Sequence, residues 1–424
     1  MRRLRTGLVT VVATLSLLVA ACSSAPTAGV QPKSSSAGGI EIGVEGPLTG
    51  IYAAVGEGFV RGAQAAVNEI NAQGGVLGRK IGTVSADDQN DPGDAVPSLN
   101  KLIDVNHIVG LDGPNSTVLP ALTPILTQNH IPTMFQGGSS FFNTNTNQWL
   151  WRPSPSDSEL GVAMAAYALA KGYKRAAVLI TSAATAESLA QTIESVYKKN
   201  GGQIISSQTV QPSLTSYQSE VQAIISSKPQ VIFTQLDPTT AAPVFTEFSQ
   251  QGGGSLHFIG SDLTAGSDFI SAVGAPVAHH LLVSIAGSTN GGPGGTSFVK
   301  YYKAEYHSAP LSGANYAYDG VMEIALAIEL AGTTNPLKIN PEIAKISDPN
   351  GTKVYNWAQA LAAIRKKQPI QYLGAGGPSG FDRYHNATGS FSAFQSNDSG
   401  SEQVVGNVSV QQLQQATAGQ LKVK

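Results

Sequence analysis

The chain has 424 residues, of which 42% are hydrophobic and 13% are charged, and its formal net charge is −2. This length predicts two or three domains with sizeable cores. The small net charge excludes a strongly basic surface, so we expect no nucleic-acid partner.

The N-terminus has the pattern of a lipoprotein secretion signal. Three arginines in residues 1–5 precede an apolar run over residues 8–21, which is too short to span a membrane comfortably. The run leads into VAAC at residues 19–22, which resembles the bacterial lipobox. This resemblance implies cleavage after residue 21 and a lipid anchor on Cys22, the only cysteine of the chain. An ordinary signal peptide with an incidental cysteine is the alternative.

A flexible linker is expected after the signal, because residues 22–39 are rich in Ser, Gly, Pro and Ala. Strands and helices then alternate. Strands are predicted at 40–44, 81–86, 107–111 and 131–135, and helices at 56–73, about 92–105 and 118–128.

The alternation resumes after a break near residues 151–156. Helices are predicted at about 159–171, 186–199, 217–227 and 240–251, and strands at 175–181, 203–210, 230–235 and 257–260. Residues 281–285 are predicted to form the strand at which the chain crosses back, and residues 296–367 are predicted to be mostly helical. Strands and turns are expected from residue 371, with a crossover at 374–380.

Strands that alternate with helices predict βαβ units and parallel sheets. We therefore expect an α/β fold with two doubly wound, Rossmann-like lobes. The N-terminal lobe comprises residues 40–153 plus about 286–370, and the C-terminal lobe comprises 154–285 plus about 371–424. Ligands of such sheets bind beyond the carboxyl ends of the strands. Three loops qualify for the cleft between the lobes, at 113–117, 136–143 and 261–266.

The patterns that enzyme chemistry requires are missing. The glycine cluster at 291–296 lacks the lysine of a phosphate-binding loop. The histidines have no metal-ligand spacing, and His279 and His280 would alternate faces on a strand. Four aspartates in residues 87–94 are better explained by turns and a helix cap than by a cation site. We expect no enzymatic activity, no metal and no cofactor.

Several motifs resemble one family when they are taken in order. They are IEIGVEGPLTG at 40–50, DDQNDPGDAV at 87–96, VGLDGPNSTVLPAL at 109–122, IPTM at 131–134, FIGSD at 258–262, YAYDGV at 316–321 and GFDRYHNATG at 380–389. The family is the branched-chain amino-acid binding proteins, the Leu/Ile/Val class of solute receptors for ABC importers, and the resemblance spans nearly all of residues 40–395. It implies a type I periplasmic binding protein fold with a multi-strand hinge. It also implies a small-molecule ligand, ABC permease and ATPase subunits as partners, and a monomer.

The resemblance places the ligand carboxylate at the loops after the third and fourth strands. This implies ligand contacts by Ser116, Thr117, Gly138 and Ser139. The chemistry is sound, because hydroxyls and free N–H groups at the start of a helix bind anions. The alternative is that Ser116 or Thr117 only caps the helix that begins near Val118.

The ligand ammonium in this family meets an acidic residue in the motif F-x-G-x-E. The sequence FIGSD puts Asp262 at this position. A carboxylate buried in a closed cleft is unfavourable unless a cation pairs with it, so Asp262 predicts a ligand with a positive group. A cap for the helix near Gly266, or a surface position, is the alternative.

Aromatic residues that line the site in many relatives are replaced here. Thr185 stands at the place of a Tyr-Gly pair, and a loop centred on Asp237 replaces another aromatic. Ala54-Val55 replaces a third, with Tyr52 close by. The resemblance then implies that Asp237, Thr185 and Tyr52 contact a larger, more polar or unusual ligand. Tyr316 and Tyr318 either form an aromatic wall or pack in the core.

We therefore expect an extracytoplasmic receptor of an ABC importer, anchored to the cell membrane at Cys22. It would bind a small polar metabolite, such as an amino acid, and deliver it to a permease. A sensor that uses the same clamp for signalling is one alternative. The same receptor fold binding a sugar or another non-amino-acid ligand is the other.

Overall fold

The computed structural model describes residues 39–287, 293–377, 380–397 and 402–421. The expected signal peptide, Cys22 and nearly all of the linker lie outside these residues, as does the start of the glycine cluster at 291–296. No helix in the described ranges is long and apolar enough to cross a membrane.

The first part of the chain forms a five-stranded parallel sheet in the order β2-β1-β3-β4-β5. Its strands are β1 (Ile40–Gly46), β2 (Ile81–Asp87), β3 (Leu111–Asp112), β4 (Thr133–Met134) and β5 (Leu150–Trp151). The connections are α1 (Ala53–Ala72), α2 (Pro92–Asp104), α3 (Leu119–Gln128) and the short η1 (Ser140–Phe142). Asp91 caps α2 through the N–H of Gly93, so this aspartate serves the helix start as expected.

The second part forms a seven-stranded sheet in the order β16-β15-β10-β9-β8-β6-β7. Its strands are β6 (Arg175–Thr181), β7 (Gln203–Val210), β8 (Val231–Gln235), β9 (His257–Gly260), β10 (Leu282–Gly287), β15 (Phe391–Ser396) and β16 (Glu402–Val408). The strands β15 and β16 are antiparallel to their neighbours. Helices α4 (Asp157–Ala170), α5 (Ala184–Lys199), α6 (Gln218–Ser227), α7 (Pro238–Gln250), α8 (Ser267–Val273), α9 (Ala275–His280) and α14 (Val410–Ala418), with η2 (Asp262–Thr264), complete this part.

Both sheets share one strand order over their parallel strands. The order β2-β1-β3-β4-β5 matches β7-β6-β8-β9-β10 position by position. In this arrangement the connections leave in opposite directions from the first and third strands, and ligands bind at that switch point. The two switch points, β1/β3 and β6/β8, therefore mark where a ligand is expected in each half.

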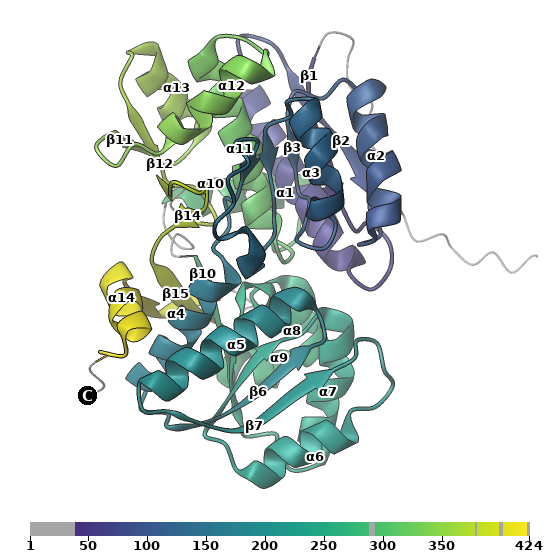
Figure 1. Cartoon of the computed structure of the whole chain (residues 1–424), viewed down its shortest axis with the longest axis vertical. Helices are drawn as coiled ribbons and strands as arrows, with labels where there is room; N and C mark the ends of the chain where they lie inside the picture. The colour runs from purple at the N-terminus through teal and green to yellow at the C-terminus, as the bar shows by residue number, and fades with distance from the viewer. Residues whose placement is uncertain (1–38, 288–292, 378–379, 398–401, 422–424) are drawn as a thin grey trace, which may run out of the picture. The chain divides into compact units, whose positions relative to one another are not determined.

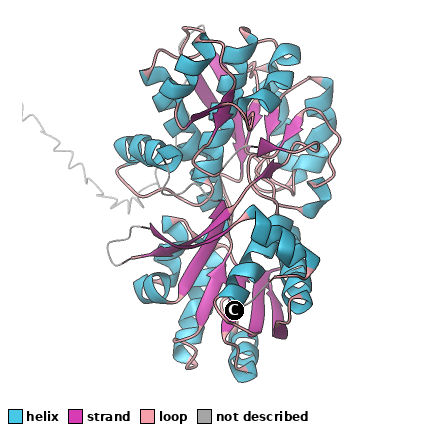
Figure 2. Ribbon diagram, turned by 90° about the vertical axis from the view of Figure 1, so that its left-hand side faces the viewer, coloured by secondary structure: helices cyan, strands magenta, loops and turns pink. Residues whose placement is uncertain are grey.

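After β10 the chain returns to the first sheet. It forms α10 (Pro293–Tyr306), α11 (Ala314–Ala331), α12 (Pro336–Ile343), η3 (Ala344–Ile346), β11 (Thr352–Val354), α13 (Trp357–Arg365) and β12 (Ile370–Tyr372), and then the small β13 (Gly380–Phe381) and β14 (Ala387–Thr388). Figure 1 shows α11 beside α1, and one hydrophobic core joins these two helices with β1. Figure 2 shows each large sheet flanked by helices.

These features confirm an α/β fold with two doubly wound lobes, while several local predictions need correction. His279 and His280 end the helix α9 and do not lie on a strand. The strand expected at 107–111 begins only at Leu111, although the Val109 N–H and the Gly110 carbonyl oxygen already hydrogen-bond to β1. The helix α14 was not predicted. The lobe boundaries given above stay predictions.

The contact between α1 and the start of α11 depends on two glycines. A Cβ atom at Gly62 would lie 2.0 Å from the carbonyl oxygen of Ala314, and one at Gly58 would lie 2.2 Å from that of Ser312. Both obstructing atoms belong to the backbone, so the helices can meet only where α1 has no side chain.

We expect Gly62→Ala to lower the free energy of unfolding by about 3 kcal/mol, the upper end for overpacking, because a backbone atom cannot rotate away. Chemical denaturation measures this. Gly254→Ala is the matched control, since a Cβ there makes only an ordinary 3.6 Å contact. Equal stability of the two variants would show that the helices separate easily.

Candidate functional site

A cavity of about 160 Å³ lies where the loops from both switch points meet. Pro47 and Tyr52 follow β1, Asn115–Thr117 follow β3, Ala183 and Thr185 follow β6, and Gln235 ends β8. The loops after β4 and β9 contribute as well, so all three loops singled out from the sequence reach one cavity. A cavity of about 150 Å³ holds a benzene-sized molecule, which sets the scale of the ligand.

One side of the cavity presents backbone donors. The N–H groups of Ser116, Gly137 and Gly138 form no hydrogen bond with any described residue. The Ser116 hydroxyl accepts the N–H of Ser139 at 3.1 Å and so ties the two loops together. These N–H groups lie near the start of α3, where the helix dipole favours an anion.

Neither Ser116 nor Thr117 caps α3. The residue before this helix is Val118, and no side chain accepts a hydrogen bond there. The Thr117 N–H donates to Asn115 Oδ1 at 2.8 Å, within a turn formed by Asn115 itself. The capping alternative for these two residues is therefore wrong, and the N–H of Ser116 is left for another partner.

The buried Arg152 orients the loop that carries Gly138. Its Nη1 donates to the carbonyl oxygens of Gly137, Gly138 and Ser139 at 3.1–3.4 Å, and its Nη2 donates to Asn143 at 2.6 Å. Arg152 is only 1% exposed. Because the carbonyl groups point at the guanidinium, the N–H groups of Gly137 and Gly138 remain free of it.

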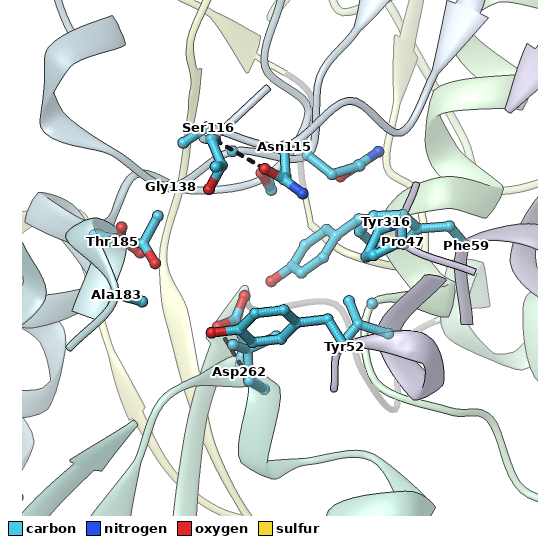
Figure 3. Close-up of a pocket in the computed structure, with 18 of the residues that line it drawn as sticks. Pro47, Tyr52, Phe59, Asn115, Ser116, Gly138, Ala183, Thr185, Asp262 and Tyr316 are labelled. Carbon is cyan, nitrogen blue, oxygen red and sulfur yellow. Dashed lines mark hydrogen bonds between the residues drawn. The ribbon is translucent and has the colours of Figure 1, made fainter. Parts of the chain in front are cut away.

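Two carboxyl groups face this donor side. Figure 3 shows Asp262 across the cavity from Ser116 and Gly138, with the hydroxyl of Tyr316 pointing between them. Asp157, at the start of α4, packs against Gly138 so closely that a Cβ there would lie 2.1 Å from its Oδ1. A hydrogen bond of 2.8 Å from the Asp157 N–H to the Gly138 carbonyl holds this approach.

Burial dominates the ionisation of both carboxyl groups. Burial raises the pKa of Asp157 to about 8, the charge of Asp262 adds to the rise, and Arg152 opposes it. Burial also raises the pKa of Asp262 to about 6, although Tyr316 and the Leu263 N–H lower it. In the ligand-free cavity these two carboxyl groups therefore hold their protons to a higher pH than usual, and a bound cation would favour their loss.

The raised pKa values predict how stability depends on pH in the absence of ligand. Both groups hold their protons more tightly in the folded chain than in the unfolded chain, where aspartate has a pKa near 3.8. Their stabilising contribution is complete below that pKa and is lost as pH rises through about 6 and then 8. We expect a melting temperature several degrees higher at pH 5 than at pH 8, measured calorimetrically. The same slope in Asp157→Asn would contradict this assignment.

The structure divides the predicted site residues into two groups. Ser116, Thr117, Gly138, Asp262, Thr185 and Tyr52 line the cavity. Ser139 and Asp237 are not among the lining residues. Ser139 accepts the Phe141 N–H at the start of η1, and Asp237 caps α7 by accepting from the N–H and hydroxyl of Thr240. Burial raises the pKa of Tyr52, and the charge of Asp237 adds to the rise.

The cavity also contains residues that sequence reasoning missed, chiefly Asp157, Gln235 and Gln136. Asp157 directly follows residues 151–156, where the sequence pattern indicates only a break between the lobes. Gln235 is the last residue of the predicted strand 230–235 and of β8. This position at the carboxyl end of a strand is the signal that could have identified it. Tyr316 lines the cavity, whereas Tyr318 is buried and donates to Glu69.

Comparison with known proteins identifies the family of this chain. The sequence model of the periplasmic binding protein family matches residues 39–402. The chain belongs to the periplasmic binding protein family. A relative of this periplasmic binding protein is the Leu/Ile/Val-binding protein homolog 2 of Brucella abortus, which is 27% identical over 308 residues and is matched over 71% of this chain and 81% of its own.

Solved structures share the fold. The branched-chain amino acid transporter substrate-binding protein LivJ of Streptococcus pneumoniae, in complex with isoleucine, has a TM-score of 0.73 at 22% identity and covers 88% of this chain and 99% of its own. An ABC-transporter solute-binding protein of R. palustris, in complex with benzoate, has a TM-score of 0.71 at 20% identity over 88% and 97%. At these identities the likeness supports the type I periplasmic binding protein fold alone.

Proposed function

We propose that this periplasmic binding protein is the solute receptor of an ABC importer, and that it binds an α-amino acid or a closely related compound. One observation carries the proposal: unpaired backbone N–H groups at Ser116 and Gly138 face the half-buried carboxyl group of Asp262 across the cavity. A zwitterion has the complementary charges at its two ends. The isoleucine bound to LivJ agrees with this ligand class.

The proposed binding mode follows from this polarity. The ligand carboxylate accepts hydrogen bonds from the N–H groups of Ser116 and Gly138, near the positive end of the α3 dipole. The ligand ammonium pairs with Asp262, whose pKa of about 6 leaves it ionised at neutral pH. Tyr316 and Tyr52, which both line the cavity, pack against the ligand. The lobes then close by a hinge motion that the ligand stabilises, and the closed form delivers the ligand to the permease.

Aromatic acids are the competing ligand class, because one structural neighbour is in complex with benzoate and another with 3,4-dihydroxybenzoic acid. The two tyrosines at the cavity suit a ring. Asp262, whose pKa is raised to about 6, is ionised at neutral pH, and an anion with no cationic group would repel it and leave it unpaired. We therefore rank amino acids first.

A thermal-shift screen tests the ligand class. The purified full chain is unfolded and refolded to remove any ligand carried through purification, and is then mixed with amino acids, aromatic acids, sugars and polyamines. A ligand at one hundred times its Kd stabilises the fold by about 2.7 kcal/mol, which is easily detected. We expect α-amino acids to raise the melting temperature. Stabilisation by benzoate or sugars alone would overturn the proposed binding mode.

Cys22 would hold the receptor at the outer face of the cell membrane through a lipid. This part of the proposal depends on the lipobox-like sequence VAAC at residues 19–22. Cys22→Ala should release the protein from the membrane fraction, and mass spectrometry should find diacylglyceryl on the wild-type N-terminus. An unmodified Cys22 would favour an ordinary signal peptide.

A further inference from the structure

Asp157 presents to the cavity a carboxyl group that no donor of the described chain reaches. The residue lines the cavity and is only 6% exposed. Its Oδ2 is buried without a partner, and no described residue donates a hydrogen bond to either oxygen. The nearby Arg152 donates instead to the carbonyl oxygens of residues 137–139 and to Asn143. A buried carboxyl group without a bonded cation or donor is far less unfavourable when it is neutral, so it tends to keep its proton.

The same carboxyl group lies against Gly138, one of the residues at which the ligand carboxylate is expected. A Cβ atom at Gly138 would lie 2.1 Å from Asp157 Oδ1 and 2.5 Å from its Oδ2. The Asp157 N–H donates to the Gly138 carbonyl oxygen at 2.8 Å and so fixes the two residues side by side. A ligand oxygen that accepts the free N–H of Gly138 therefore lies beside the Asp157 carboxyl group.

Two ionised carboxylates at such close range repel each other, whereas one proton between them forms a short and strong O–H···O⁻ hydrogen bond. We infer that Asp157 keeps its proton in the complex and donates its O–H to the ligand carboxylate, an inference that rests on the proposed function. Asp157 is then a third donor for the carboxylate, beside the N–H groups of Ser116 and Gly138. Asp262 is left as the carboxylate that pairs with the ligand ammonium.

Charged groups from two other segments act on the proton of Asp157. Burial raises the pKa of Asp157 to about 8, the charge of Asp262 at the start of η2 adds to the rise, and Arg152, directly after β5, opposes it. The charge of Arg152 is shared with Glu159 and Asp382. A ligand carboxylate adds a negative charge beside Asp157 and raises its pKa further in the complex.

Binding above pH 8 should therefore take up a proton. At pH 9, one unit above the pKa of Asp157, only about one ligand-free molecule in ten still carries this proton. The affinity for a carboxylate ligand should then fall about tenfold between pH 7 and pH 9. Asp262, with a pKa of about 6, and Arg152, with a pKa of about 10, largely keep their charges over this range. The pKa values of the lining residues Tyr52 and Tyr316 are raised above that of ordinary tyrosine.

Isothermal titration calorimetry at pH 7 and pH 9 tests the role of Asp157. The probes are isoleucine, glutamine and benzoate, titrated into the ligand-stripped full chain. We expect the Kd of a binding probe to rise about tenfold from pH 7 to pH 9. Titrations at pH 9 in buffers of different ionisation enthalpy should show the uptake of nearly one proton. Benzoate has no group that titrates in this range, and the amino acids are compared between the wild type and variants at the same pH.

Two variants separate a neutral donor from an anion at position 157. Asp157→Asn keeps a donor of the same size that cannot ionise, so it should bind within about threefold of the wild type at pH 7 and take up no proton at pH 9. Asp157→Leu removes the donor and should weaken binding at pH 7 at least about tenfold, as for a lost hydrogen bond to a charged group. Asp104→Asn, an exposed position near the end of α2, is the control and should keep the wild-type pH profile. If a variant at position 157 does not fold, the pH profile of the wild type still decides.

A failure of this role can be told apart from a failure of the proposed function. If an amino acid binds equally well at pH 7 and pH 9, or if Asp157→Asn binds it more than about thirtyfold more weakly, Asp157 acts as an anion and the inference is wrong while amino-acid binding stands. If benzoate binds and neither amino acid does, the proposed function fails, and the pH profile with benzoate decides the role of Asp157. If none of the three probes binds, both fail.

Discussion

We expect Asp262→Asn to weaken the binding of an α-amino acid by about 2–5 kcal/mol, which is roughly a 30- to 4,000-fold rise in Kd. Asp262 provides the carboxylate opposite the Ser116 and Gly138 N–H groups. Asparagine keeps the size of the side chain and removes its charge. The ligand ammonium would then be buried against a neutral amide, with Asp157 as its only carboxylate neighbour among the lining residues.

Titration calorimetry measures this loss, and Asp104→Asn, an exposed residue near the end of α2, serves as the control. The wild type offers a second test. Since burial raises the pKa of Asp262 to about 6, acidification below that value should weaken binding in the same direction as the variant. Unchanged affinity in Asp262→Asn would remove this residue from the ligand site.

The second large effect is expected at Asp319, in the middle of α11. Its carboxyl group accepts hydrogen bonds from the Tyr372 hydroxyl and from the N–H groups of Ala375 and Gly376. Burial raises its pKa to about 7 while these hydrogen bonds lower it. Asp319→Ala leaves three donors unpaired inside the protein, so we expect a loss of about 3–5 kcal/mol in the free energy of unfolding.

Denaturant titration with Asp104→Ala as the control measures the effect of Asp319→Ala. The two N–H donors, Ala375 and Gly376, lie in the segment that follows β12 and leads to β15 in the second sheet. A loose segment should therefore also expose its amides, and hydrogen exchange at residues 375 and 376 should accelerate. A stability loss below about 1 kcal/mol would mean that water replaces the carboxyl group at this place.

The fold class and the position of the cavity were accessible from the sequence, because both depend on local patterns. The alternation of apolar periods 2 and 3.6 identifies strands and helices, and parallel sheets place their loops at one edge. The loops that carry Ser116, Gly138 and Asp262 follow strands and were found for that reason, whereas the residues themselves were implied by the family resemblance. The short strands β3 to β5 were placed less accurately, since two residues carry little periodic signal.

The errors at the site have a different origin. Asp237 follows a strand just as Asp262 does, yet its oxygens are taken by Thr240 at the start of α7. Sequence patterns cannot tell a helix cap from a ligand contact when both occur after a strand. Asp157 was missed because its closeness to Gly138 depends on two chain segments meeting in space, which no local period reveals.

The pairing of α1 with α11 also determines when the first lobe is able to form. Glu69 of α1 accepts hydrogen bonds from Tyr318 and from the Trp357 N–H, which lie 249 and 288 residues further along the chain. A growing chain therefore completes the five contiguous strands β6 to β10 before the partner of α1 exists. Such distant pairings carry a large loop-closure cost and slow folding. Until residue 331 has been synthesised, the part of α1 that packs against α11 lacks its partner, and this is the surface that a holding chaperone would recognise.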